Sequence, residues 1–180
     1  MSSEGDNALV QAARQGDQTA FEELLNRNET RVYNVIMRVT GNREDASDAT
    51  QSAFFKAYRN LDSFKPEHRF FSWVCRIGVN EALNLMKRER RSTLLDFEPR
   101  SSHPGPEAVA AGRETGDQIQ VALQELTPDY RVVVVLRHFQ GFTYQEISDT
   151  LEIPLKTVKS RLFSARQALR ELLVRDGLLK

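Results

Sequence analysis

Residues 143–169 constrain the fold of this chain most, because they hold two helix signals separated by a tight turn. Thr143 and Glu146 have the spacing of a capping box, in which the hydroxyl and the carboxylate each satisfy a free backbone amide at the start of a helix. Ile153 and Pro154 then turn the chain, and a second helix is expected from about residue 155 toward residue 174. This order predicts a helix-turn-helix.

The second helix of this motif separates its residues by face. Three- and four-residue steps place the apolar side chains on one stripe: Val158, Leu162, Ala165, Leu169 and Leu172. No acidic residue occurs from 155 to 170, and the other side carries cations and short hydroxyls. Such a face suits the DNA major groove, with lysines and the helix N-terminus on phosphates and Arg, Ser or Thr on base edges. The predicted DNA contacts are Lys156, Thr157, Lys159, Ser160, Arg161, Phe163, Ser164 and Arg166. An ordinary solvated helix can also carry a basic face, but the capped helix and tight turn before it favour DNA binding.

The rest of the chain also has helical spacing, and no useful stretch alternates with period two. Gly41 and Asn42 supply a helix stop followed by a new start, so helices are expected up to residue 40, over 43–60 and over 70–91. The β-branched run "RVVVVLRHF" resembles a buried strand, but the N-cap signal "TPD" just before it favours a helix. The predicted fold class is all-α.

A change of composition divides the chain. Residues 92–116 hold three of the six prolines and three of the nine glycines and have no sustained periodicity. A structureless loop of this length is uncommon inside a compact domain, so a flexible linker is the better interpretation. We therefore expect two small helical domains, residues 1–91 and 117–180, joined by this linker.

Composition excludes several classes of function. Lys plus Arg and Asp plus Glu are both 25, a balance that still permits a nucleic-acid partner because phosphate contact depends on local clustering. One cysteine and three scattered histidines give neither a disulfide framework nor a metal site. Without a glycine-rich phosphate loop or a Ser/Cys–His constellation, no enzymatic activity and no cofactor are expected. The polar N-terminus and the lack of a run of roughly 18 apolar residues predict a soluble, cytoplasmic protein without membrane insertion.

The N-terminal half contains two helices with different surfaces. In the helix over 70–91, one face carries Arg76, Asn80, Asn84 and Lys87 after a group of aromatic residues, a combination that suits a single strand of nucleic acid. Most of those aromatics, Phe71 and Trp73 above all, are better interpreted as core. In the helix over 43–60, polar or acidic residues lie beside apolar ones: Asp45, Asp48 and Gln51 with Phe54, Phe55 and Tyr58. This surface suits a protein partner, although an ordinary amphipathic helix shows the same pattern.

Three segments together resemble bacterial RNA polymerase sigma factors of the extracytoplasmic-function group, the sigma-E-like kind. They read "DASDATQSAFFKAY", "FFSWVCRIGVNEALN" and "LTPDYRVVVVLRHFQGFTYQEISDTLEIPLKTVKSRLFSARQAL". The similarity extends over about residues 8 to 173. It implies an initiation factor that joins core RNA polymerase and directs it to promoters, reading the minus-thirty-five element as duplex and the minus-ten element as opened strand.

The resemblance also implies roles for particular residues. The polymerase surface, facing the beta-prime clamp helices, would comprise Asp45, Asp48, Gln51, Phe54 and Tyr58. The residues that open and read the minus-ten element, with a flipped base held beside the loop, would be Lys65, His68, Arg69, Phe70, Arg76, Asn80, Asn84 and Lys87. The C-terminal domain would contact the beta flap and read the minus-thirty-five element, and the linker would run toward the RNA path. An anti-sigma factor covering both domains is expected as a further partner.

Two residues depart from the family pattern, and one other class of protein has a similar C-terminus. Lys156 stands where the family often has glycine, and Glu81 lies on the minus-ten helix where a basic or neutral residue is more usual. A response regulator with a helix-turn-helix output domain is the alternative. Its receiver domain needs alternating strands and helices, and residues 1–91 show no such strands.

Overall fold

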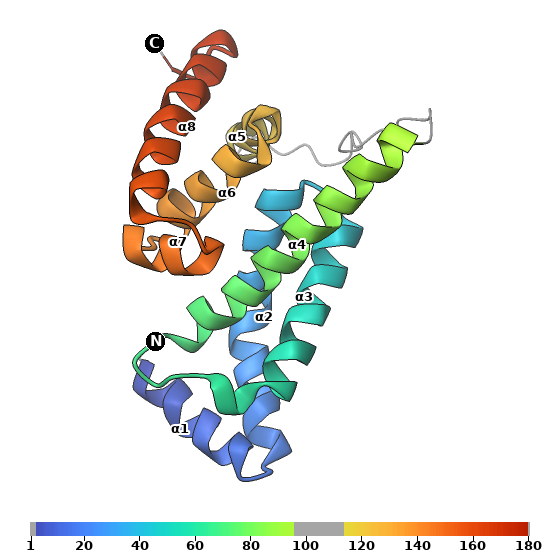
Figure 1. Cartoon of the computed structure of the whole chain (residues 1–180), viewed down its shortest axis with the longest axis vertical. Coiled ribbons are helices and arrows are strands. Elements are labelled where there is room, and N and C mark those ends of the chain that lie inside the picture. The colour runs from blue at the N-terminus through green and yellow to red at the C-terminus, as the bar shows by residue number, and fades with distance from the viewer. Residues whose placement is uncertain (1–2, 96–113, 180) are drawn as a thin grey trace.

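The computed structural model describes residues 3–95 and 114–179, with side chains for 5–88 and 116–179. Every regular element in these ranges is helical, which confirms the predicted all-α class (Figure 1). Within the same ranges, no helix is both long and apolar enough to cross a membrane.

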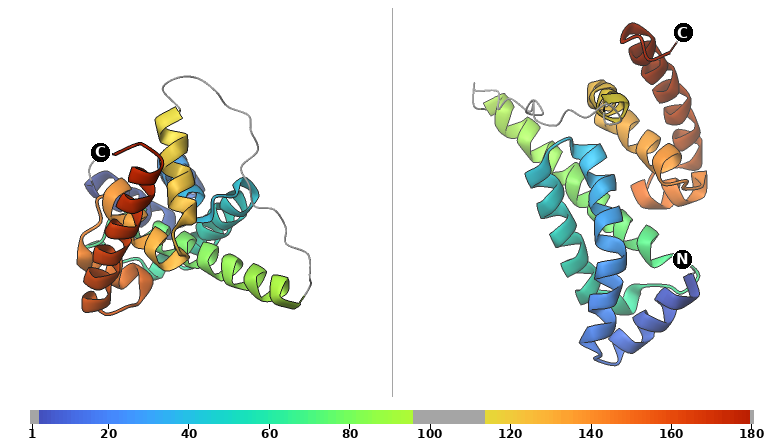
Figure 2. Two further views of the ribbon diagram at one scale, coloured as in Figure 1. Left: turned by 90° about the horizontal axis from the view of Figure 1, so that it is seen from above. Right: turned by 180° about the vertical axis from the view of Figure 1, so that it is seen from behind.

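Four α-helices form the N-terminal group: α1 (Ser3–Arg14), α2 (Gln18–Thr40), α3 (Arg43–Arg59) and α4 (Phe70–Leu95). Helices α2, α3 and α4 pack against one another, and α1 crosses one end of α2 (Figures 1 and 2). Gly78 lets α4 approach closely, because a Cβ there would lie 2.6 Å from the Cδ1 atom of Ile36. The predicted break at Gly41 and Asn42 is confirmed: Gly41 ends α2 with φ 73°, and the Asn42 side chain caps α3.

The C-terminal group consists of α5 (Glu114–Glu125), α6 (Pro128–Val134), the π-helical turn η2 (Val135–Phe139), α7 (Tyr144–Leu151) and α8 (Leu155–Arg175). The valine run is helical, as predicted, although the Thr127 side chain makes no capping bond. The capping box is confirmed: the Glu146 amide donates to Thr143 Oγ1 at 3.1 Å, and the Thr143 amide donates to Glu146 Oε2 at 2.7 Å. Helices α7 and α8 form the predicted helix-turn-helix.

Two helix ends differ from the expected linker boundaries. Helix α4 continues to Leu95, four residues past the predicted end, because no glycine or proline interrupts the chain between Gly78 and Pro99. Helix α5 begins at Glu114, inside the predicted linker. The remainder of that predicted linker, residues 96–113, lies outside the described residues.

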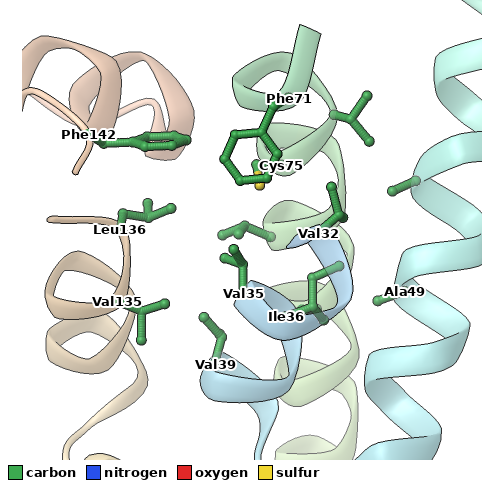
Figure 3. Close-up of a cluster of buried hydrophobic side chains, with 14 of the residues drawn as sticks. Val32, Val35, Ile36, Val39, Ala49, Phe71, Cys75, Val135, Leu136 and Phe142 are labelled. Carbon is green, nitrogen blue, oxygen red and sulfur yellow. The ribbon is translucent and has the colours of Figure 1, made fainter. Parts of the chain in front are cut away.

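The two helical groups share one apolar core, which the sequence had not indicated. Figure 3 shows Val135 and Leu136 of η2 facing Val35 and Val39 of α2, and all four side chains are fully buried. Next to them, the ring of Phe142 meets the ring of Phe71 edge to face, with 6.2 Å between centroids. Residues from both predicted domains therefore form a single continuous hydrophobic cluster.

We call this contact between α2 and the C-terminal group the seam. A buried arginine lies at its polar end. Arg131 of α6 is 5% exposed, and its Nη1 donates to the carbonyl of Val39 at 2.7 Å. Its Nη2 donates to the carbonyls of Gln124 and Leu126 at 2.7 and 3.1 Å, and Gln124 Nε2 donates to the carbonyl of Arg38 at 3.1 Å. The last carbonyls of a helix have no partner within it and form its negative end. The C-terminal group therefore binds α2 at its C-terminal end, where the helix itself provides no donors for the last carbonyls.

Gly41 gives a test of this seam. A Cβ at Gly41 would lie 2.4 Å from Gln124 Cδ. We expect Gly41→Ala to lower the free energy of unfolding by more than the roughly 1–2 kcal/mol of a left-handed alanine, because Gln124 must also move. The matched control is Gly141→Ala: Gly141 has φ 70°, and no described atom lies within 4 Å of its Cβ position. Equal losses for the two variants in denaturant unfolding would contradict the close packing of Gln124 on the end of α2.

Candidate nucleic-acid and protein interfaces

Helix α8 presents the predicted basic face to solvent. Its apolar side is held against α6 and α7, with Val158, Leu162 and Ala165 fully buried. The opposite side exposes residues at three- and four-residue steps: Lys156, Lys159, Ser160, Phe163 and Arg166. Thr157 and Ser164 are half-buried between the two sides. The structure thus brings together most of the residues that were predicted to contact DNA on this helix.

The N-terminus of α8 is available to an anion. Pro154 occupies the N-cap position, and no side chain within the described ranges caps the helix there. Lys156, in the first turn, is exposed at this end, where the Thr157 amide donates to the carbonyl of Pro154 at 2.8 Å. Free backbone amides and the positive end of a helix favour phosphate binding. This end of α8 is therefore suited to a DNA backbone contact.

Two arginines of α8 already have partners inside the C-terminal group. Arg161 forms an ion pair with Asp129, with 2.8 Å between Nη2 and Oδ2, so it is directed toward α6 and away from the exposed set. Arg166 Nε donates to His138 Nε2 at 3.1 Å. Partial burial lowers the pKa of His138, and the nearby charges of Arg166 and Arg137 lower that pKa further. A lower pKa favours the neutral imidazole, the form that accepts this bond.

The polar face of α4 is only partly open to solvent. Asn84 and Lys87 are exposed, whereas Arg76 and Asn80 are half-buried. Arg76 Nη2 lies 2.7 Å from Glu152 Oε1, an ion pair between α4 and the turn of the helix-turn-helix. Sequence patterns gave no signal for this pair, because its partners are 76 residues apart.

The loop before α4 places its charged residues in solvent and its aromatic residues in the core. Lys65, His68 and Arg69 are all exposed. Phe70 had been predicted to contact DNA, but it is 1% exposed and packs with Phe64 and Trp73. Contact of Phe70 with DNA therefore stays a prediction, and in this structure its ring is buried. Phe70 is the first residue of α4, and its buried ring supports the loop from the core side.

Glu81, the acidic departure on α4, has local partners. Lys56 Nζ lies 2.6 Å from Glu81 Oε1, and Ser52 Oγ donates to Glu81 Oε2 at 3.3 Å. Both partners belong to α3. The carboxylate is therefore directed along the packed side of α4 and not into the row of asparagines.

A groove of about 790 Å³ runs between α2 and α3. Phe54, 4% exposed, and Phe21 are buried side chains that line it. Phe55 and Tyr58 also line the groove, and they are 60% and 47% exposed. Large apolar side chains that remain exposed beside an apolar groove are typical of a protein-binding surface.

Glu22 and Glu29 of α2 line this groove, and α3 carries a further acidic residue one turn before Gln51. Asp48 and Gln51 are exposed one turn apart on α3, and Gln51 lines the groove. Burial raises the pKa of Asp45, and the neighbouring charges of Asp48 and Glu44 raise it further. The groove thus combines apolar contact area with negative charge at its border, as the sequence had suggested.

Comparison with known proteins identifies both helical groups. Residues 24–92 match sigma-70 region 2, and residues 116–169 match sigma-70 region 4. The extracytoplasmic-function RNA polymerase sigma-E factor of Escherichia coli K12 is 34% identical over 176 residues, covering 91% of this chain and 92% of the relative.

Solved structures agree with this assignment. CnrH in complex with the cytosolic domain of CnrY aligns with a TM-score of 0.72 at 26% identity, covering 96% of this chain and 99% of CnrH. The sigma factor RpoE of Bartonella quintana in complex with the anti-sigma factor NepR has the same fold, with a TM-score of 0.69 at 24% identity over 85% of this chain and 96% of RpoE. No receiver-like strand occurs among the described residues, so the response-regulator alternative is not supported. The chain belongs to the RNA polymerase sigma factors of the extracytoplasmic-function group and directs the polymerase to promoters.

Proposed function

We propose that this sigma factor holds a promoter at two points while bound to core RNA polymerase. Helix α8 reads the minus-thirty-five element as duplex, and the loop over 64–69 together with the polar face of α4 reads the minus-ten element as opened strand. The observation that carries this proposal is the separation of exposed cations and amides onto two faces, each backed by a buried apolar side.

The exposed residues of α8 fit the chemistry of a major groove. Lys156 and Lys159 neutralise phosphates, and Ser160 and Arg166 are long or polar enough to reach base edges. Phe163, 64% exposed, offers an apolar contact of the kind that thymine methyl groups accept. Arg161 contributes less to DNA in this scheme, because Asp129 engages it.

The loop and α4 fit a single strand. Lys65 and Arg69 follow a phosphate backbone, while Asn80 and Asn84 offer amides to unpaired base edges. Phe70 does not stack on a base in this scheme, because it lies in the aromatic cluster under the loop.

The groove between α2 and α3 is the proposed polymerase surface. The apolar side chains of Phe54, Phe55 and Tyr58 supply contact area, while Asp48 and Gln51 at its border select a partner of complementary charge. The partners in this scheme are the beta-prime clamp helices at the groove and the beta flap at the C-terminal group. This role places the chain with the polymerase in the cytoplasm, and it needs neither catalysis nor a cofactor from the chain itself.

An anti-sigma factor is the proposed regulator. The similar RpoE structure is a complex with the anti-sigma factor NepR. The exposed apolar residues Phe55 and Tyr58 give such a protein a surface that overlaps the polymerase site. Occupation of this surface would keep the factor from the polymerase.

The basic face of α8 is tested with two substitutions. We expect Arg166→Ala and Lys159→Ala each to weaken holoenzyme binding to the minus-thirty-five duplex by about tenfold, because each removes a base or phosphate contact. Loss of a phosphate contact at Lys159 should also make the slope of log affinity against log salt concentration less steep by about 1. Arg175→Ala, at the far end of α8, is the charge-matched control and should leave the affinity unchanged. Equal loss of polymerase association in a pull-down would count against a separate DNA role for this helix.

The groove is tested by adding a cation. Gln51→Arg and Asp48→Arg should abolish co-purification with core polymerase, because each places a positive charge where the surface is negative or neutral. Gln11→Arg makes the same charge change at an exposed position of α1 outside the groove. Undiminished recovery of the Gln51→Arg variant with polymerase would contradict the assignment of this groove as the polymerase surface.

The ion pair of Arg76 with Glu152 must open before Arg76 reaches a DNA strand. We therefore expect Glu152→Gln to raise the affinity of the free sigma factor for a single-stranded minus-ten oligonucleotide by up to about threefold, the scale of one exposed ion pair. Fluorescence anisotropy measures this change. The control is Glu171→Gln, which removes the same charge at an exposed position of α8 that is away from α4. An increase of the same size in that control would show that general electrostatics, and not release of Arg76, causes the effect.

A further inference from the structure

Helix α1 lies beside the loop that enters α4 (Figure 1). The helix precedes residue 24, where the similarity to sigma-70 region 2 begins, and it carries none of the residues assigned above to DNA or polymerase. Its contacts with the loop are nevertheless specific. They are made by hydrogen bonds from side chains of α1 to backbone carbonyls of the loop.

Arg14, the last residue of α1, binds carbonyls of the short 3₁₀-helix η1 (Leu61–Ser63) and of Phe64 just after it. Its Nη2 donates to the carbonyls of Leu61, Asp62 and Phe64 at 2.9, 3.1 and 2.5 Å. Its Nε donates to the carbonyl of Leu61 at 3.2 Å and lies 3.8 Å from Asp62 Oδ1. The Arg14 side chain is only 19% exposed. A planar guanidinium with several donors is suited to fixing such a group of acceptors, which a lysine ammonium matches less well.

Asn7 extends the same set of bonds further along the loop. It lies seven residues before Arg14, about two helical turns, and therefore on the same side of α1. Its Nδ2 donates to the carbonyl of Pro66 at 3.1 Å. Four carbonyls between Leu61 and Pro66 thus accept bonds from one helix.

These bonds hold the backbone just before the charged residues of the loop and, at Pro66, beside Lys65. The Phe64 ring is held from the core side by Phe70 and Trp73, with centroid distances of 5.8 and 5.4 Å. The α1 side chains hold the backbone from the other side, and Lys65 and Arg69 remain exposed. Fixing the backbone in advance lowers the entropy that must be lost when a ligand orders the loop.

We propose that Arg14 and Asn7 are positioning residues for minus-ten recognition: they fix the backbone over 61–66 and thereby hold the loop over 64–69 in the conformation that receives a base of the opened strand. This inference rests on the proposed minus-ten role of that loop. Helix α1, outside the part that matches region 2, thereby sets how strictly the minus-ten element is read.

The test uses the full chain with core polymerase and a promoter obtained by selection from random DNA. Each minus-ten position is replaced in turn, and the ratio of cognate to substituted affinity is measured for wild type and Arg14→Gln. We expect Arg14→Gln to lower this ratio about tenfold at one or two positions, because a bond network from a charged donor is lost. Binding of the minus-thirty-five duplex and recovery with polymerase should stay within twofold of wild type. A purely structural role would change all three measurements together.

Arg27→Gln is the matched control. Arg27 of α2 pairs with Asp6 of α1 at 3.6 Å and with Glu23 at 2.7 Å, so this variant loosens α1 without touching the loop. It should leave the minus-ten ratio unchanged. If Arg14→Gln does not fold, Asn7→Ala removes the single bond to Pro66 and should lower the ratio about threefold.

Unchanged base discrimination in folded Arg14→Gln, or in Asn7→Ala where that variant is needed, overturns the positioning role. A different result would refute the wider proposal, that the loop reads the minus-ten element. If Arg69→Ala and Lys65→Ala also leave minus-ten discrimination at the wild-type value, the loop itself does not read the strand. If those two variants lose discrimination while Arg14→Gln keeps it, only the role of α1 is refuted.

Discussion

The bonds between the end of α2 and the pair Arg131 and Gln124 hold the two helical groups in one body. The carbonyls of Arg38 and Val39 have no partner within their own helix, and they accept from these two side chains. The guanidinium of Arg131 is buried, so the charge is tolerable only because carbonyls surround it. Opening the seam exposes Val135 and Leu136 of η2 and leaves these acceptors to water. Together with the shared apolar core, this contact places the C-terminal group against α2.

This arrangement treats the two promoter-binding faces differently. Helix α8 exposes its basic side, the proposed surface for duplex DNA, to solvent. The first half of α4 lies under the helix-turn-helix, where Phe71 meets Phe142 and Arg76 meets Glu152. The two faces are thus not equally accessible in this conformation. In the proposed scheme, an opened strand that binds along the whole of α4 requires the C-terminal group to move and the Arg76–Glu152 ion pair to open.

The sequence predicted best what depends on near neighbours. The capping box of Thr143 and the break at Gly41 involve residues within three positions of each other, and the α8 stripe follows from helical spacing alone. Contacts between distant segments were not predictable in this way. Arg131 binds a carbonyl 92 residues away, and it had looked like one more residue of a valine-rich helix. The burial of Phe70 was not predictable either, because several aromatics stand together and only the packing of the loop decides which of them enter the core.

The central claim is that this chain gives core polymerase its promoter choice through two separate sequence elements. Run-off transcription from genomic fragments, with purified core polymerase in the presence and absence of the chain, measures this most directly. The account predicts discrete transcripts only when the chain is present, each starting downstream of a shared pair of sequence elements with constant spacing. Transcripts that are independent of the chain, or that share only a single element, would contradict it.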